Sequence, residues 1–346
     1  MHFTNHTAYS RVDKKNRNFK NNGVPMLNRK LGKFEVSAIG LGCMPLSGMP
    51  LSRAHMLEKR DQAIATVHAA LDAGITLLDT ADIYSPTWNS MGHNEILVAE
   101  AIRTWNAPTE SKRKIVIATK GGITRGPGGD WFGTAGRNAN EHYLYRAVEA
   151  SAARLGRSSI QVWHHHRLDP SLTFQDQFQN VLKLKEHGYI ENIGLSNINI
   201  SQLNRAIELG GTPSEGGIVS VQNEFSPRYR HSDDVRERCQ EIGIAFLPWS
   251  PLGGIGNDKN LEAGNYGSFD EVAKKYGVSA FAITVAWHLA TSSVSLPIPG
   301  ATRIHSILDT LQGVGIQLSD EDLELLNASL PPLGPIHPEL VDVDGL

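Results

Sequence analysis

Four side chains with complementary proton chemistry follow successive apolar runs of the sequence: Asp79, Tyr84, Lys120 and His166. A carboxylate keeps a neighbouring lysine charged, and a charged lysine lowers the pKa of a nearby phenol from about 10 toward neutrality. Such a phenol can give a proton to a developing alkoxide, while a histidine hydrogen-bonds the same oxygen. The set favours reduction of a carbonyl. It contains no strong nucleophile, and it needs no metal.

His166 is the last of three consecutive histidines, which could also be interpreted as a metal site. Side chains alternate along a strand, so His164 and His166 should point to one side and His165 to the other. The three rings therefore do not converge on one ion. We expect His166 to carry chemistry, His164 to lie beneath the pocket, and His165 to face the helical layer.

These residues belong to an alternating pattern of strands and helices. Eight short apolar runs predict strands, at 36–42, 75–79, 114–120, 160–166, 190–196, 217–222, 243–249 and 294–299. Amphipathic segments lie near 60–73, 93–104, 140–155, 174–188, 199–209, 232–242, 279–291, 303–312 and 319–329. Eight strand–helix units predict an α/β fold, a closed (β/α)8 TIM barrel, in which functional groups gather at the carboxyl ends of the strands.

A doubly wound open sheet is the competing architecture. It calls for a G-x-G-x-x-G turn after the first strand, but "GLGCMP" places Pro45 where the third glycine belongs. We find no phosphate-binding GxxxxGK[ST] loop and no interdomain linker. A single domain over residues 26–346 is therefore expected. Residues 1–25, rich in Asn, Lys and Arg, are expected to form a disordered extension.

Bulk properties exclude several classes of protein. The formal net charge of −3 lacks the basic footprint of a nucleic-acid binder. Two distant cysteines exclude a disulfide framework. No apolar run approaches membrane-spanning length, and no secretory signal is recognisable. We expect a cytoplasmic protein that is a monomer or homo-oligomer, with a small-molecule carbonyl substrate and neither nucleic-acid nor membrane partners.

Seven motifs make the sequence resemble the aldo/keto reductase superfamily, in particular its bacterial-type general members. They are "AGITLLDTADIYS", "IVIATKGG", "HHHRLDP", "GYIENIGLSN", "VQNEFSP", "PWSPLGG" and "IPGATR", in the family's order, between about Arg29 and Leu330. The resemblance implies an NAD(P)H-dependent reductase of aldehydes or ketones, reversible toward alcohol oxidation.

The resemblance also implies a role for each matching residue. Tyr84 would be the general acid, Lys120 paired to Asp79 would tune it, and His166 would orient the carbonyl. The implied cofactor-binding residues are Cys43, Met44, Asp79, Ser196, Asn197, Gln222, Trp249, Ser250, Pro251, Leu252, Gly253, Gly300, Thr302, Arg303 and Asp309. Trp249 would stack on the nicotinamide, the alternative being that it is a core residue. Cys43 could be a small apolar filler.

The segments at both ends of the expected site depart from the family's pattern. After the last strand, Arg303 is the one cation left to recognise a 2′-phosphate, which favours NADP(H) without excluding NAD(H). Two extended loops, 85–94 and 126–140, should rim the pocket. Their residues Trp88, Trp131 and Phe132 are candidates for an aromatic substrate wall, the alternative being loop packing.

Two other functions are compatible with the same motifs. Some superfamily members serve as cofactor-binding subunits of potassium channels, and these keep the same residues. A specific alcohol, sugar or pyridoxal dehydrogenase would differ only in substrate and direction.

Overall fold

A computed structural model describes residues 26–47, 59–126, 136–253 and 267–329. The predicted extension 1–25 and the candidate substrate residues Trp131 and Phe132 lie outside the described residues.

A curved parallel sheet forms the centre of the fold. Its strands follow one another in chain order: β3 (Leu41–Gly42), β4 (Leu77–Asp79), β5 (Val116–Gly121), β6 (Val162–His165), β7 (Ile193–Ser196), β8 (Ile218–Gln222) and β9 (Ala245–Phe246). Every residue of these strands is buried, because helices cover the outer face and side chains fill the interior. The predicted barrel is confirmed.

The eighth position of the barrel is filled by residues 294–300, which form bridges but no regular strand. Ser295 pairs with Phe246 of β9, and Gly300 pairs with Gly42 of β3, so the segment closes the ring. Gly42 N donates to Pro299 O over 3.0 Å. Two residues of the segment are prolines, which have no N–H to donate, so a continuous ladder cannot form.

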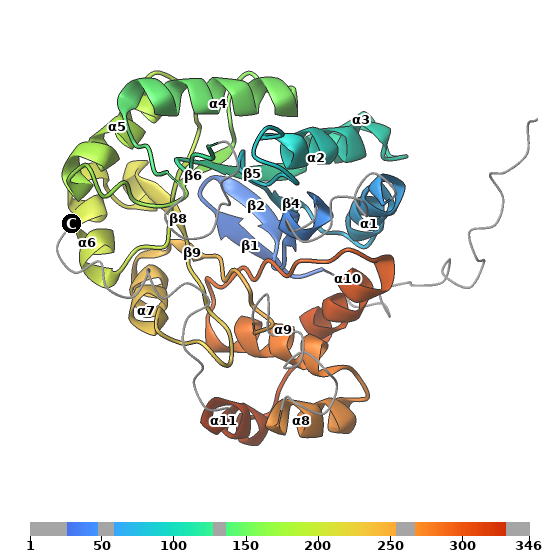
Figure 1. The fold of residues 1–346 in the computed structure, drawn as a ribbon. Coiled ribbons are helices and arrows are strands. Elements are labelled where there is room, and N and C mark those ends of the chain that lie inside the picture. The colour runs from blue at the N-terminus through green and yellow to red at the C-terminus, as the bar shows by residue number, and fades with distance from the viewer. Residues whose placement is uncertain (1–25, 48–58, 127–135, 254–266, 330–346) are drawn as a thin grey trace, which may run out of the picture.

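The expected first strand, 36–42, was wrong as a single element. Its first residues belong to β2 (Phe34–Ser37), which pairs antiparallel with β1 (Asn28–Leu31) in a separate hairpin. Leu31 and Val36 of this hairpin pack with the side chains that fill the barrel. Figure 1 shows the hairpin in the middle of the ring of helices, where it covers one end of the barrel. The side chains that fill this end of the barrel are apolar, and the hairpin keeps them out of contact with water.

Helices surround the sheet (Figure 1). They are α1 (Arg60–Asp72), α2 (His93–Thr104), α3 (Thr109–Arg113), α4 (Glu141–Leu155), α5 (Phe174–Glu186), α6 (Ile200–Gly210), α7 (Asp233–Ile242), α8 (Ser268–Tyr276), α9 (Ala280–Thr291), α10 (Ile304–Leu311) and α11 (Asp320–Ala328). The nine predicted segments are confirmed to within about two residues at each end. The sequence patterns did not single out α3 and α8. No helix in the described part of the chain is long and apolar enough to cross a membrane.

Candidate active site

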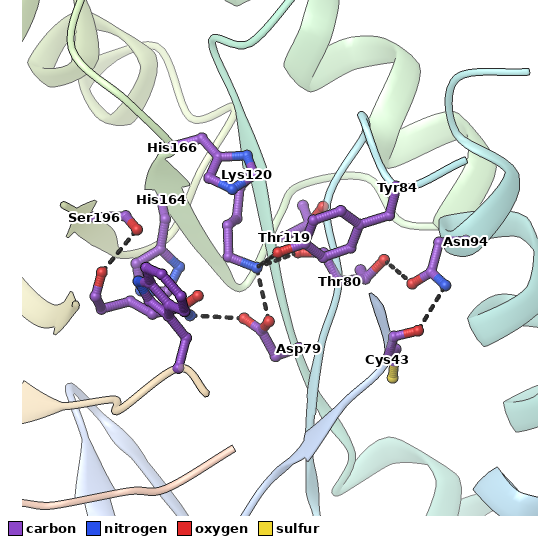
Figure 2. Close-up of polar contacts among 12 residues, drawn as sticks. Cys43, Asp79, Thr80, Tyr84, Asn94, Thr119, Lys120, His164, His166 and Ser196 are labelled. Atoms are coloured by element: carbon purple, nitrogen blue, oxygen red, sulfur yellow. Dashed lines mark hydrogen bonds and ion pairs between the residues drawn. The ribbon is translucent and has the colours of Figure 1, made fainter. Parts of the chain in front are cut away.

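The carboxyl ends of β4 and β5 bring three of the four predicted catalytic residues together (Figure 2). Lys120 Nζ donates to Asp79 Oδ2 over 2.7 Å, to Thr80 O over 2.8 Å and to the Tyr84 hydroxyl over 3.1 Å. An ammonium has three donors, and all three are satisfied although Lys120 is fully buried. Because Lys120 has nothing to accept with, the Tyr84 oxygen is the acceptor in this contact and its own proton is directed elsewhere.

The fourth residue, His166, follows β6 and faces Tyr84. Their ring centroids lie 5.7 Å apart at an interplanar angle of 81°. His166 N donates to Gly121 O over 2.9 Å, which fixes the residue beside the strand that carries Lys120. His166 Nδ1 is buried without a hydrogen-bond partner among the described residues. The structure therefore places all four predicted side chains in one cluster.

The three histidines lie in different surroundings, as the alternation predicted. His164 points into the barrel, where its Nε2 lies 3.0 Å from Ser220 Oγ. His165 stacks on Trp163 on the opposite side of the strand, with centroids 6.3 Å apart. Burial lowers the pKa of His164 to about 3 and that of His165 to about 4, so both are neutral at physiological pH.

The electrostatics of Tyr84 differ from the expectation. Burial raises the pKa of its phenol, and this effect outweighs the opposite effect of the Lys120 charge. The expected net shift toward neutrality was wrong, because Tyr84 is 7% exposed and its phenolate anion would lose hydration. Burial also lowers the pKa of Lys120, but Asp79 and Tyr84 raise it by more, so the lysine stays charged.

His166 is a neutral imidazole in this environment. Burial lowers its pKa well below the usual 6.5, and the positive charge of Lys120 adds to the effect. A neutral imidazole offers one N–H donor and one acceptor. It can therefore hydrogen-bond an oxygen atom that lies beside the Tyr84 hydroxyl.

A connected amide network lies beside these residues, at the ends of β7, β8 and β9. Gln222 Nε2 donates to Asp79 Oδ1 over 2.8 Å. Asn197 adopts a left-handed backbone, with φ of 59°, and its Nδ2 donates to Ser196 Oγ over 3.0 Å. Trp249 Nε1 donates to Asn197 Oδ1 over 3.0 Å. Four predicted nicotinamide contacts are thus joined to each other or to Asp79.

The turn after β9 has features of an anion site. Ser250 has a positive φ of 50°, and its buried hydroxyl has no hydrogen-bond partner within the described part of the chain. A buried unpaired hydroxyl costs free energy unless a ligand completes its hydrogen bond. Gly253 follows at φ of 105°, Leu252 lies between them half-buried, and Pro251 O accepts from His288 Nε2 over 2.9 Å. These residues fit a phosphate-bearing cofactor.

The predicted contacts for the other end of the cofactor lie around the start of α10. Gly300 packs tightly, because a side-chain Cβ there would lie 2.7 Å from Pro45 Cγ. Arg303 is exposed and precedes the first residue of α10, next to exposed Thr302. Asp309 lies on α10, where its carboxylate accepts from Ser279 Oγ over 2.5 Å and from Gln312 Nε2 over 3.2 Å. The bond from Ser279, the N-cap of α9, gives Asp309 a role in joining α10 to α9, whereas Gln312 directly follows α10.

Cys43 and Met44 lie at the end of the first barrel strand. Burial raises the pKa of the Cys43 thiol, so the group is not a thiolate. Its carbonyl oxygen accepts from Asn94 Nδ2 over 2.8 Å. Met44 is half-buried and packs beside Tyr84 in a small apolar cluster. Trp88, the one described residue of the predicted substrate wall, is 42% exposed.

Sequence reasoning missed the polar residues behind the catalytic ones. Thr80 and Thr119 adjoin Asp79 and Lys120 in the chain, and both hydroxyls bond side chains of α2. The alternation of strand side chains could have indicated them, since the neighbours of inward-pointing residues point outward.

Comparison with known proteins identifies the family of this chain. The sequence profile of the aldo/keto reductase family matches residues 38–330. This chain belongs to the aldo/keto reductase family and is an oxidoreductase. It is 31% identical over 294 residues to an uncharacterised oxidoreductase of Schizosaccharomyces pombe, covering 84% of this chain and 86% of that protein. It is 30% identical over 330 residues to a probable aldo-keto reductase of Glycine max, covering 87% and 88%.

Solved aldo-keto reductases share its fold. An enzyme from Klebsiella pneumoniae in complex with NADPH superposes with a TM-score of 0.70 at 23% identity, covering 91% of this chain and 98% of that one. The thermostable reductase Tm1743, in complex with epalrestat, gives 0.70 at 24% identity, covering 87% and 99%. These structures show the aldo-keto reductase fold, and the two sequence relatives come from a yeast and a plant.

Proposed function

We propose that this aldo/keto reductase uses NADP(H) to reduce an aldehyde or ketone to the alcohol, reversibly. The observation that supports it best is the hydrogen-bonded set Asp79–Lys120–Tyr84 with His166 facing the phenol. A reduced nicotinamide, when bound, supplies a hydride to the carbonyl carbon. The protein must then stabilise and protonate the oxygen on which charge develops.

The phenol of Tyr84 is suited to give that proton. Its raised pKa keeps it protonated at neutral pH, and the Lys120 ammonium 3.1 Å away stabilises the phenolate that donation leaves behind. Asp79 holds the Lys120 ammonium in place, and Gln222 holds the Asp79 carboxylate in place. The neutral His166 orients the carbonyl oxygen toward the phenol.

The residues that would hold the cofactor follow from the donors described above. Ser196, Asn197 and Gln222 offer amide and hydroxyl groups suited to a carboxamide, and Trp249 offers an aromatic face. The hydroxyl of Ser250, which has no hydrogen-bond partner among the described residues, suits a phosphate oxygen. Arg303, exposed before α10, is the candidate for a 2′-phosphate, which is the reason we propose NADP(H).

The role of Tyr84 is tested by following NADPH consumption with 4-nitrobenzaldehyde. Tyr84→Phe keeps the ring and removes the proton, so kcat should fall by about 10²- to 10⁴-fold. NADPH affinity should change little, and this serves as the folding control. If Tyr84→Phe turns over as fast as wild type, Tyr84 is not the acid.

The cofactor preference is tested separately by titrating NADPH and NADH into wild type and Arg303→Ala. Loss of a charge-assisted phosphate contact should weaken NADPH binding by roughly tenfold and leave NADH binding unchanged. Equal loss for both cofactors would contradict the assignment of Arg303 to the 2′-phosphate.

A further inference from the structure

The residues adjacent to Asp79 and Lys120 are anchored on the outer side of the strands. Asp79 and Lys120 point toward each other in the site, so Thr80 and Thr119 point outward to the helical layer. Thr80 Oγ1 donates to Asn94 Oδ1 over 2.7 Å, and Thr119 Oγ1 donates to Glu95 Oε1 over 2.6 Å.

Both acceptors lie in the first turn of α2, at consecutive positions. The four residues joined by these two bonds are fully buried: Asn94, Glu95, Thr80 and Thr119. Glu95 is held from its other side by Arg154 Nε, 2.6 Å from Oε2. The Thr80–Asn94 bond is neutral, and the Thr119–Glu95 bond is charge-assisted. Both bonds are buried away from water, so they fix this turn of the helix on two neighbouring strands.

The same turn also contacts the proposed acid and the segment that follows the first barrel strand. Asn94 N donates to Tyr84 O over 3.1 Å. Its side-chain Nδ2 donates to Cys43 O over 2.8 Å and to Ser47 Oγ over 2.7 Å. Figure 2 shows Asn94 between Thr80 and Cys43, on the far side of Tyr84 from Lys120. One helical turn therefore links the strands of Asp79 and Lys120 to Tyr84.

We propose that Asn94 and Glu95 are positioning residues for the reduction, acting through Thr80 and Thr119. They set the place of the Tyr84 hydroxyl relative to Lys120 Nζ, and they touch none of the reacting atoms. The inference rests on the proposed function of Tyr84 as the acid. A displacement of about 1 Å at a reacting group can cost about 10²-fold in rate, so loosening either link should lower kcat.

The test uses threonine variants that change one hydroxyl each in the full chain. Thr80→Val and Thr119→Val keep the shape and remove the donor, whereas Thr80→Ser and Thr119→Ser keep the donor. Thr104→Val is the control, because Thr104 lies at the other end of α2, where its hydroxyl bonds, among the described residues, only within the helix and to His68. For each variant we would measure kcat and KM with 4-nitrobenzaldehyde, NADPH affinity and the melting temperature.

Each valine variant is expected to lose about tenfold in kcat, with KM and NADPH affinity within about twofold of wild type. The serine variants should recover most of kcat, and Thr104→Val should match wild type. A general loss of stability would lower the melting temperature without lowering the kcat of the folded enzyme.

Three results would overturn the inference. In the first, both valine variants keep kcat within about twofold of wild type; in the second, the serine variants lose as much as the valine variants. Either result leaves the proposed function intact if wild type is active. In the third, wild type binds NADPH and reduces none of a panel of carbonyls, which overturns the proposed function and with it the inference.

Discussion

At the residue scale, burial sets the protonation of both groups that would meet the substrate oxygen. The pKa of Tyr84 is raised above its usual 10 and that of His166 lies well below 6.5. The acid form of Tyr84 is lost only as pH rises through the raised pKa, and His166 gains a proton only far below 6.5. We therefore expect kcat for reduction to be flat from about pH 6 to about pH 9. A fall in kcat centred near pH 7 to 8 would show that the Lys120 charge lowers the pKa of Tyr84 by more than burial raises it.

Lys120 should matter for stability as well as for rate. Lys120→Met leaves the buried Asp79 carboxylate with Gln222 as its remaining side-chain donor. Removing one partner of a buried ion pair costs about 3–5 kcal/mol, so denaturant unfolding should show a loss of this size. The kcat should fall by at least about 100-fold. The double variant Asp79→Asn/Lys120→Met should regain much of the stability and none of the rate, and recovery of rate would contradict the proposed role.

At the scale of elements, the start of α2 depends on one glycine. Gly92 has a φ of 84°, which an L side chain adopts with strain, and a Cβ there would overlap the side chain of Arg154. Gly92→Ala should therefore displace Arg154 from Glu95 and shift the turn that holds Tyr84. We expect a melting temperature lower by several degrees and a kcat lower by about tenfold.

Gly156, at the end of α4, is the matched control. It also has a positive φ, of 63°, but a Cβ there would meet nothing within 4 Å. Gly156→Ala should thus cost only the backbone strain, about 1 kcal/mol, and leave kcat unchanged. Equal effects of the two alanines on kcat would contradict a special role for the start of α2.

At the scale of the whole molecule, buried neutral histidines make stability depend on pH. Burial holds the pKa of His164 near 3 and those of His165 and His288 near 4, below the unfolded value of 6.5. Between 6.5 and these values the unfolded chain binds more protons, so stability is full above pH 6.5 and falls as pH decreases. Each histidine contributes a slope of about 1.4 kcal/mol per pH unit.

Denaturant unfolding at pH 7.5, 6.0 and 5.0 measures this slope. His165→Leu should reduce this slope by the contribution of about one proton, because the His165 ring stacks on Trp163 and is otherwise enclosed. A stability that stays constant from pH 7.5 to 5.0 would contradict the burial of these rings.

Much of the architecture could be predicted because periodicity and turn chemistry act locally. The helix segments were predicted to within a turn, and the separation of His164 from His165 followed from strand geometry alone. The strand at 36–42 was predicted wrongly because an apolar run does not reveal whether it pairs with a neighbouring strand or with a hairpin. The irregular closure at 294–300 was equally hidden, although its prolines are visible in the sequence.

The sequence by itself determined the residue types that can do the chemistry and the order of the elements that carry them. Only the tertiary structure decided the electrostatics, because the sign of the Tyr84 shift depends on how completely the fold excludes water from the phenol. The tertiary structure also decided which residues support the site. Asn94 and Glu95 reach Thr80 and Thr119 only because α2 packs across the ends of two strands, and contacts between residues distant in the chain exist only once the barrel has formed.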